Sequence, residues 1–238
     1  MEHKSFVVVD AIPLLNQLPH HVANAIMVVV FLMVIAYLGT RGLRKNTKKS
    51  FIPEAKLTFR TAGEMIVEGL LKIVKDNMGP RGPEFMMIIG ALALFIFTSN
   101  ALGLIPGFLS PTENINTTAA CAITVFCFTH YYGLREHGIK YLKHFVGPVM
   151  WLAPIMVPIE LISHLVRPLS LSVRLFGNIF GDHTAFAIFF GLIPLVIPLP
   201  MMVLGLFVAI VQAFVFILLS MAYFAGAIEG HEPEEHEG

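Results

Sequence analysis

The amino-acid sequence predicts an all-α integral membrane protein with about five transmembrane helices and one interfacial amphipathic helix. Of its 238 residues, 56% are hydrophobic and only 13% are charged, whereas soluble domains carry about 25% charged residues. The mean hydropathy is +0.75. Long apolar stretches also follow one another with loops too short to fold separately. We therefore expect one membrane domain over residues 1–230, followed by an acidic cytoplasmic tail over residues 229–238.

The first predicted span covers residues 21–38, which carry no charge. A cluster of positive residues follows this span at once, and such clusters mark the cytoplasmic side of a membrane, so the N-terminus is expected outside. Residues 54–76 then repeat a charged residue every four positions with apolar residues on the opposite face. This pattern predicts an amphipathic helix lying in the membrane interface, with a solvated connector as the alternative. The positive cluster comprises Arg41, Arg44, Lys45, Lys48 and Lys49.

A second span is predicted over residues 84–105 and a third over residues 117–134. The loop between them contains no Lys or Arg, which predicts that it lies outside. Arg135 follows the third span. Because positive residues mark the cytoplasmic side, this span is expected to end in the cytoplasm.

The last two spans are predicted to be long and tilted. Residues 149–192 exceed the roughly 20 residues that cross a bilayer upright, so this segment is either broken or strongly tilted. Its polar pattern keeps one helical register, which favours a single tilted helix. A final span over residues 201–228 then ends in the cytoplasm.

The most informative stretch covers residues 160–183, which read ELISHLVRPLSLSVRLFGNIFGDH. A charge at the bilayer centre costs roughly 2.5 to 3.5 kcal/mol, so charges in such a stretch indicate a functional site. At 100° per residue, six residues of this stretch, counting Glu160 itself, lie within about 40° of Glu160 around the helix axis. His183 points about 140° away and needs a second environment. The polar stripe comprises Glu160, His164, Arg167, Arg174, Asn178 and Asp182.

The centre of this stretch resembles a known family. The segment PLSLSVRLFGN over residues 168–178, with Glu160 fourteen residues before Arg174, closely resembles the signature of subunit a of the F-type ATP synthase. TSNALGLIPG over residues 98–107 is similar to a second block of that family, and QAFVF over residues 212–216 with Tyr223 is similar to a third. The resemblance covers about residues 6–230.

The resemblance implies a proton-translocating stator subunit that is not an enzyme by itself. Such a subunit forms two aqueous half-channels against a rotor ring of c subunits and couples ion flow to ring rotation and ATP synthesis. The implied partners are the c-ring, the b subunits of the peripheral stalk, the rest of the ATP synthase complex and the lipid bilayer. The implied location is a bacterial plasma (inner) membrane.

The resemblance also suggests roles for individual residues. Arg174 matches the arginine that faces the rotor carboxylate, and a guanidinium cannot be deprotonated in proteins. Glu160 matches the glutamate of the cytoplasmic access path. His183 stands where many relatives carry a glutamate, and Gly205 occupies the site at which some relatives exchange that residue. A structural or electrostatic role is expected for Arg167, in preference to a catalytic one. The remaining candidates for the proton path are Asn178, Asp182, Gln212, Ser170, Asn100 and Tyr223.

Two other functions fit the residues alone. A secondary ion-coupled transporter could bind a substrate with Glu160, Arg174 and Asp182, and a membrane scaffold could use the same charges as structural pairs. No cofactor is predicted, since a glycine-rich phosphate loop is absent from the sequence. The zero net charge argues against nucleic-acid binding. No metal site is predicted, and the sequence leaves open whether the coupling ion is H⁺ or Na⁺.

Overall fold

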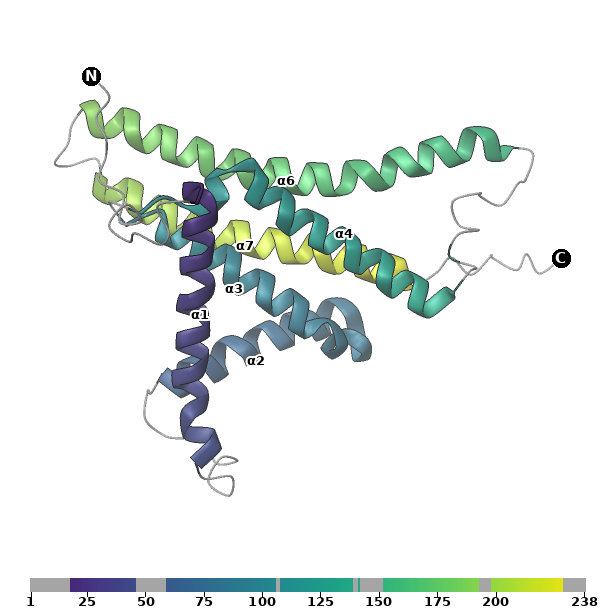
Figure 1. Ribbon diagram of the computed structural model, residues 1–238, viewed down its shortest axis with the longest axis horizontal. Coiled ribbons are helices and arrows are strands. Elements are labelled where there is room, and N and C mark those ends of the chain that lie inside the picture. Colours follow the sequence, from purple (N-terminus) through teal and green to yellow (C-terminus); the bar gives the residue numbers. More distant parts are fainter. Residues whose placement is uncertain are drawn as a thin grey trace.

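The computed structural model describes residues 18–45, 59–105, 108–138, 141, 152–192 and 198–228. All regular elements in these residues are helices, which confirms the predicted all-α fold (Figure 1). The predicted acidic tail lies outside the described residues. The elements are α1 (His20–Lys45), α2 (Phe59–Met78), η2 (Gly79–Phe85), α3 (Met86–Leu102), η3 (Pro111–Glu113), α4 (Ile115–His137), α6 (Ala153–Leu192) and α7 (Pro198–Ile228).

Four helical segments in the described part of the chain are long and apolar enough to cross a membrane: His20–Arg41, Arg60–Leu102, Pro154–Phe186 and Pro200–Ile228. The second of these joins α2 through η2 to α3. The predicted third span exists as the 23-residue helix α4, which is long enough to cross but contains several polar residues. A fifth transmembrane helix therefore stays a prediction, as does the interfacial position of α2.

The longest element, α6, is one continuous helix of 40 residues. It passes through Pro158 and Pro168 without a break, as the register of its polar stripe predicts. At 1.5 Å per residue it is about 60 Å long, roughly twice the thickness of the hydrocarbon core. In Figure 1, α6 and α7 run across the view while α1 crosses them steeply. In a bilayer that α1 crosses upright, α6 must be strongly tilted.

The last helix, α7, begins at Pro198, three residues before the predicted start. Proline is well tolerated in the first turn of a helix because the amide hydrogen that it lacks has no intrahelical partner there. The two prolines at residues 198 and 200 therefore both lie in the first turn of α7.

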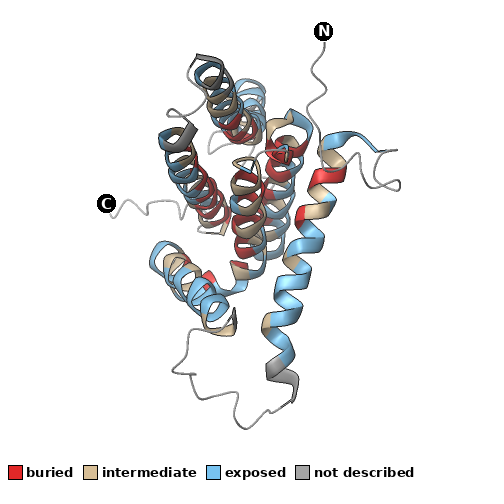
Figure 2. Ribbon diagram, turned by 90° about the vertical axis from the view of Figure 1, so that its left-hand side faces the viewer, coloured by how far each residue is buried: buried red, intermediate tan, exposed pale blue. Residues whose placement is uncertain are grey.

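The core lies where α3, α4, α6 and α7 pack against one another, and Figure 2 shows their buried faces turned inward. Leu171 and Leu175 of α6 are buried in this core together with Phe216 and Phe224 of α7. Phe224 stacks on Phe85 with ring centroids 5.6 Å apart. This packing fixes the face that α6 presents to the bundle, and so also the face that it presents outward.

An ion pair fastens the turn before α3 to the end of α4. The guanidinium of Arg81 donates two hydrogen bonds of 2.8 Å, one to each carboxylate oxygen of Glu136. Hydrogen bonding to Arg81 lowers the pKa of Glu136 from its ordinary value of 4.5. A depressed carboxyl pKa stabilises the fold above the ordinary pKa, and this stabilisation is lost as the pH falls through the lowered value.

We therefore expect Glu136→Gln to weaken the acid sensitivity of the fold. The thermal unfolding midpoint of the variant should fall less than that of the wild type when the pH drops from 6 to below 4, because the variant has no carboxylate to protonate at this site. Above pH 5 it should be slightly less stable, since exposed ion pairs contribute little. Glu68→Gln, an exposed change on α2, serves as the control. Identical pH profiles for wild type and Glu136→Gln would contradict this assignment.

Candidate functional site

Arg174 lies near the middle of α6 and points away from the bundle. Its side chain is exposed, whereas Leu171 and Leu175 beside it are 2% and 0% exposed and pack into the core. Among the described residues, no ion pair or hydrogen bond involves Arg174. A guanidinium remains charged in any protein environment. The fold therefore presents a permanent positive charge on the outer face of a membrane helix.

One turn farther along α6, a pair of amides connects this helix to α7. The amide nitrogen of Asn178 donates a hydrogen bond to the amide oxygen of Gln212. Gln212 is only 2% exposed, and a buried amide is costly unless it is hydrogen-bonded. The two candidates that the sequence places on different helices thus lie together, beside Arg174.

Toward the start of α6, a residue of the polar stripe, His164, lies against α4. The ring of His164 lies with Nε2 3.1 Å from a carboxylate oxygen of Glu160. His164 is buried, and its ring centroid lies 5.2 Å from that of His130 on α4. Nδ1 of His130 is in turn 2.8 Å from the hydroxyl of Tyr141. Glu160 therefore belongs to a chain of four titratable side chains.

The closeness of Tyr141 to α4 depends on Gly133. A Cβ atom at this position would lie 2.4 Å from the ring of Tyr141, too close for any side chain. Sequence patterns do not reveal this chain of groups, because its members come from separate segments. His164 lies on the predicted stripe, but nothing in the sequence indicates that His130 and Tyr141 approach it.

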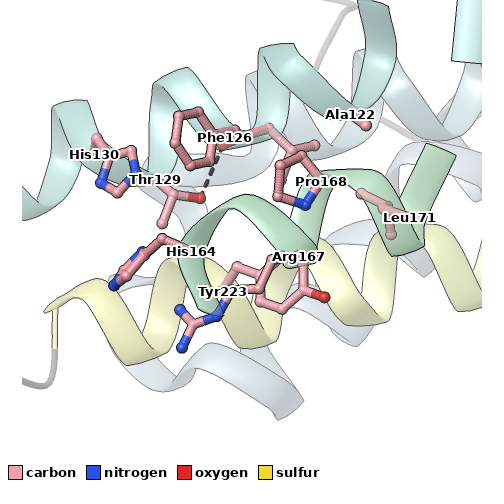
Figure 3. Close-up of a pocket in the computed structure, with 10 residues that line it drawn as sticks. Ala122, Phe126, Thr129, His130, His164, Arg167, Pro168, Leu171 and Tyr223 are labelled. Carbon is pink, nitrogen blue, oxygen red and sulfur yellow. Dashed lines mark hydrogen bonds between the residues drawn. The ribbon is translucent and has the colours of Figure 1, made fainter. Parts of the chain in front are cut away.

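A small pocket opens beside these residues, between α4, α6 and α7 (Figure 3). Its volume is about 10 Å³, room for about one water molecule. Arg167 and Tyr223 line it, and the guanidinium carbon of Arg167 lies 5.8 Å from the centre of the Tyr223 ring. Glu160 pairs with His164 instead of Arg167. Arg167 therefore joins α6 to α7 by a cation–π contact.

Toward the other end of α6, the adjacent residues Asp182 and His183 point into different surroundings. His183 Nδ1 lies 3.0 Å from a carboxylate oxygen of Glu113 in η3. Glu113 thus provides the separate polar environment that was expected for His183, which points away from the polar stripe. A carboxylate oxygen of Asp182 lies so close to Gly205 that a Cβ atom there would be only 2.9 Å from it. Sequence reasoning missed Glu113, although it is the only charged residue in the loop between α3 and α4.

The remaining candidates divide between buried and exposed positions. Asn100 is 2% exposed and accepts a 2.6 Å hydrogen bond from the hydroxyl of Thr112. Ser170 is exposed on α6. Its neighbour Ser172 is buried and lies 3.1 Å from the hydroxyl of Thr118 on α4, so this serine packs α6 against α4.

Taken along α6, these positions form one arrangement. A permanent positive charge stands in the middle, and groups that can bind and release protons lie on either side, around Glu160 and around Asp182 and His183. The described residues include no group of three or more side chains suited to hold a metal ion. Fold and site together define an integral membrane protein of the ion-conducting class.

Comparison with known proteins identifies the family. Residues 22–225 match the model of the family described as ATP synthase A chain. The chain is 50% identical to ATP synthase subunit a 2 of Syntrophotalea carbinolica over 83% of each chain. It is 47% identical to ATP synthase subunit a of Geotalea daltonii over 88% of each, and 45% identical to that of Geobacter sulfurreducens over 87% of each. The chain belongs to the ATP synthase A chain family.

Membership of this family confirms the resemblance noted in the sequence. The family is the proton-channel stator subunit of the F-type ATP synthase, so the chain conducts protons, forms part of that complex and does not itself catalyse ATP synthesis.

Proposed function

We propose that Arg174 faces the rotor ring of c subunits and forces each arriving ring carboxyl group to release its proton. The observation that carries this proposal is the exposure of Arg174 near the middle of α6, without a described partner. A nearby positive charge stabilises the ionised form of a carboxyl group and so lowers its pKa. The length and tilt of α6 would allow it to lie along the curved surface of a ring.

Protons would reach the ring through two half-channels on opposite sides of Arg174. Glu160 and Tyr223 would line the cytoplasmic half-channel, in which the small pocket offers room for a water molecule. Asp182, His183 and Asn100 would line the outer one. Arg174 repels cations, so a proton could not pass directly between the half-channels and would have to travel on the ring.

The polar residues nearest Arg174 would serve this arrangement. The hydrogen bond between Asn178 and Gln212 would hold α6 against α7 and so keep the charge at a fixed distance from the ring. Ser170, exposed one turn before the arginine, would face the same interface.

The proposed orientation follows from charge. The positive cluster after the first span and Arg135 after the third would place these ends in the cytoplasm, with the N-terminus outside and the C-terminus inside. The membrane would be the bacterial plasma (inner) membrane, where b subunits of the peripheral stalk would hold the chain against rotation.

One proton crossing a potential of 100 mV releases about 2.3 kcal/mol, and several such steps per turn would drive ATP synthesis elsewhere in the complex.

A comparison of complexes with and without this chain tests the proposal. We expect liposomes with the whole complex to acidify on ATP addition, whereas complex lacking this chain should hydrolyse ATP without acidification. Liposomes containing only the chain should accumulate no substrate, which separates the stator from a secondary transporter. Acidification that survives removal of the chain would refute the proposal.

A further inference from the structure

The ion pair between His183 and Glu113 joins α6 to the outer loop, and the function above assigns no role to Glu113. The two side chains are 20% and 31% exposed, so both remain partly open to their surroundings. Nδ1 of His183 contacts the carboxylate of Glu113, while Nε2 of the same ring faces Gly103. A Cβ atom added to Gly103 would lie only 2.8 Å from this Nε2 atom. The glycine thus leaves the space that lets the imidazole ring reach Glu113.

A second carboxylate lies on the other side of this histidine along α6. Asp182 fills the space over Gly205 on α7, and a Cβ atom on that glycine would also come within 2.5 Å of Leu104. In the part of the chain that the structure describes, neither Asp182 nor Glu113 forms an ion pair with a lysine or arginine. His183 therefore stands between one carboxyl group on the outer loop and one turned toward the last helix.

Glu113 is also connected to a buried polar network. Next to it in the chain, Thr112 is fully buried and bonds to Asn100, while Ser110 lies 2.7 Å from Thr112 and donates to the backbone carbonyl of Ser99. The amide nitrogen of Asn100 and the hydroxyl of Ser99 are buried without a partner among the described residues.

On α1, which packs against η3, the side chain of Asn24 is 1% exposed. Both of its polar atoms also lack a described partner. Buried polar groups are costly unless they form hydrogen bonds, and buried water is what usually satisfies those that protein groups leave unpaired. The elements α1, α3 and η3, which pack against one another, thus each carry buried polar side chains, and Glu113 directly follows one of them in the chain.

We propose that Glu113 is a proton-relay residue of the outer half-channel, working through His183. This inference rests on the stator function proposed above. During synthesis, the carboxylate of Glu113 takes a proton from outside water and passes it to Nδ1 of neutral His183, which becomes an imidazolium. The imidazolium then loses the proton from Nε2 to water, and the carboxylate of Asp182 accepts it on the side that faces the ring. Glu113 is again ionised, and one proton has moved inward. His183 is again neutral but carries its proton on Nδ1, so the ring resets by exchanging that proton with water until the proton again lies on Nε2.

The alternative is that Glu113 merely fastens the loop to α6. Glu113→Gln separates the two roles, because its amide oxygen still accepts a hydrogen bond from the ring while the amide carries no titratable proton. We expect assembled complex with Glu113→Gln to pump protons at least about tenfold more slowly, as losing a proton-transfer group does in other proteins, and its coupled ATP hydrolysis to slow with pumping. Glu113→Asp should recover part of the rate.

Inverted membrane vesicles would provide the measurement, with ATP-driven acidification followed by a fluorescent dye and assembly checked by immunoblot. If Glu113→Gln pumps like the wild type while Glu113→Ala pumps slowly, the residue is a fastener and the relay is refuted. Wild-type rates for both variants would refute it as well. Arg174→Ala in the same type of vesicles distinguishes failure of the Glu113 relay from failure of the stator function. Loss of pumping in Arg174→Ala shows that the stator function holds even where the relay is refuted.

Discussion

Replacing Arg174 with alanine should abolish ATP-driven proton pumping while the complex still assembles. The reason is that the side chain forms no described hydrogen bond or ion pair inside the chain, so its loss costs little stability, yet it supplies the permanent charge on the exposed face near the middle of α6. Without that charge, a ring carboxyl group arriving opposite α6 would keep its proton, since nothing lowers its pKa. Acidification of inverted membrane vesicles measures pumping, and the amount of this chain in purified complex measures assembly.

Two further variants sharpen this test. Arg174→Lys keeps a positive charge, but lysine can lose its proton in an apolar environment, so pumping should be well below wild type and above the alanine variant. Arg81→Ala removes an exposed arginine outside the stripe and should leave pumping near the wild-type rate. Normal pumping by assembled Arg174→Ala complex would favour the scaffold interpretation, in which the charges serve only structure.

Replacing Phe224 with alanine should destabilise the chain more than any surface change. The side chain is 0% exposed and packs its ring against Phe85 and Tyr132, with centroids 5.6 and 6.0 Å away. Core Phe→Ala changes cost about 3–5 kcal/mol because a cavity remains and dispersion contacts are lost. Packing of this kind is a main source of helix association in membranes. We expect a markedly lower temperature for loss of this chain from detergent-solubilised complex.

Phe214→Ala is the matched control. Phe214 lies on the same helix but is 43% exposed, so the same chemical change removes few contacts within the chain. Its dissociation temperature should stay close to that of the wild type. Equal losses at Phe214 and Phe224 would show that the aromatic core between η2, α4 and α7 does not hold this chain together.

Much of the fold follows from local patterns. Apolar stretches of sufficient length predict the helices, and the continuous register of the polar stripe predicts that residues 160–183 belong to one unbroken helix. Arg174 is identifiable for the same reason, since a charge within an apolar stretch needs a functional explanation. Helix ends are less well predicted: α7 begins at Pro198, three residues before the predicted start, because a proline can also occupy the first turn of a helix.

The partners of the polar residues could not be predicted in this way. Glu113 and His183 are 70 residues apart in the chain, and no local pattern links a loop glutamate to a helical histidine. The approach of His130 to His164 and the cation–π contact of Arg167 with Tyr223 likewise join separate helices.

The sequence by itself determined the class of protein, its long helices and the stripe that carries Arg174, because these depend on the composition and spacing of neighbouring residues. Only the tertiary structure decided which stripe residues turn inward to partners and which remain exposed. The physical reason is that the packing of α6 against α4 and α7 sets its rotation about its own axis. That rotation leaves Arg174 on the outer face.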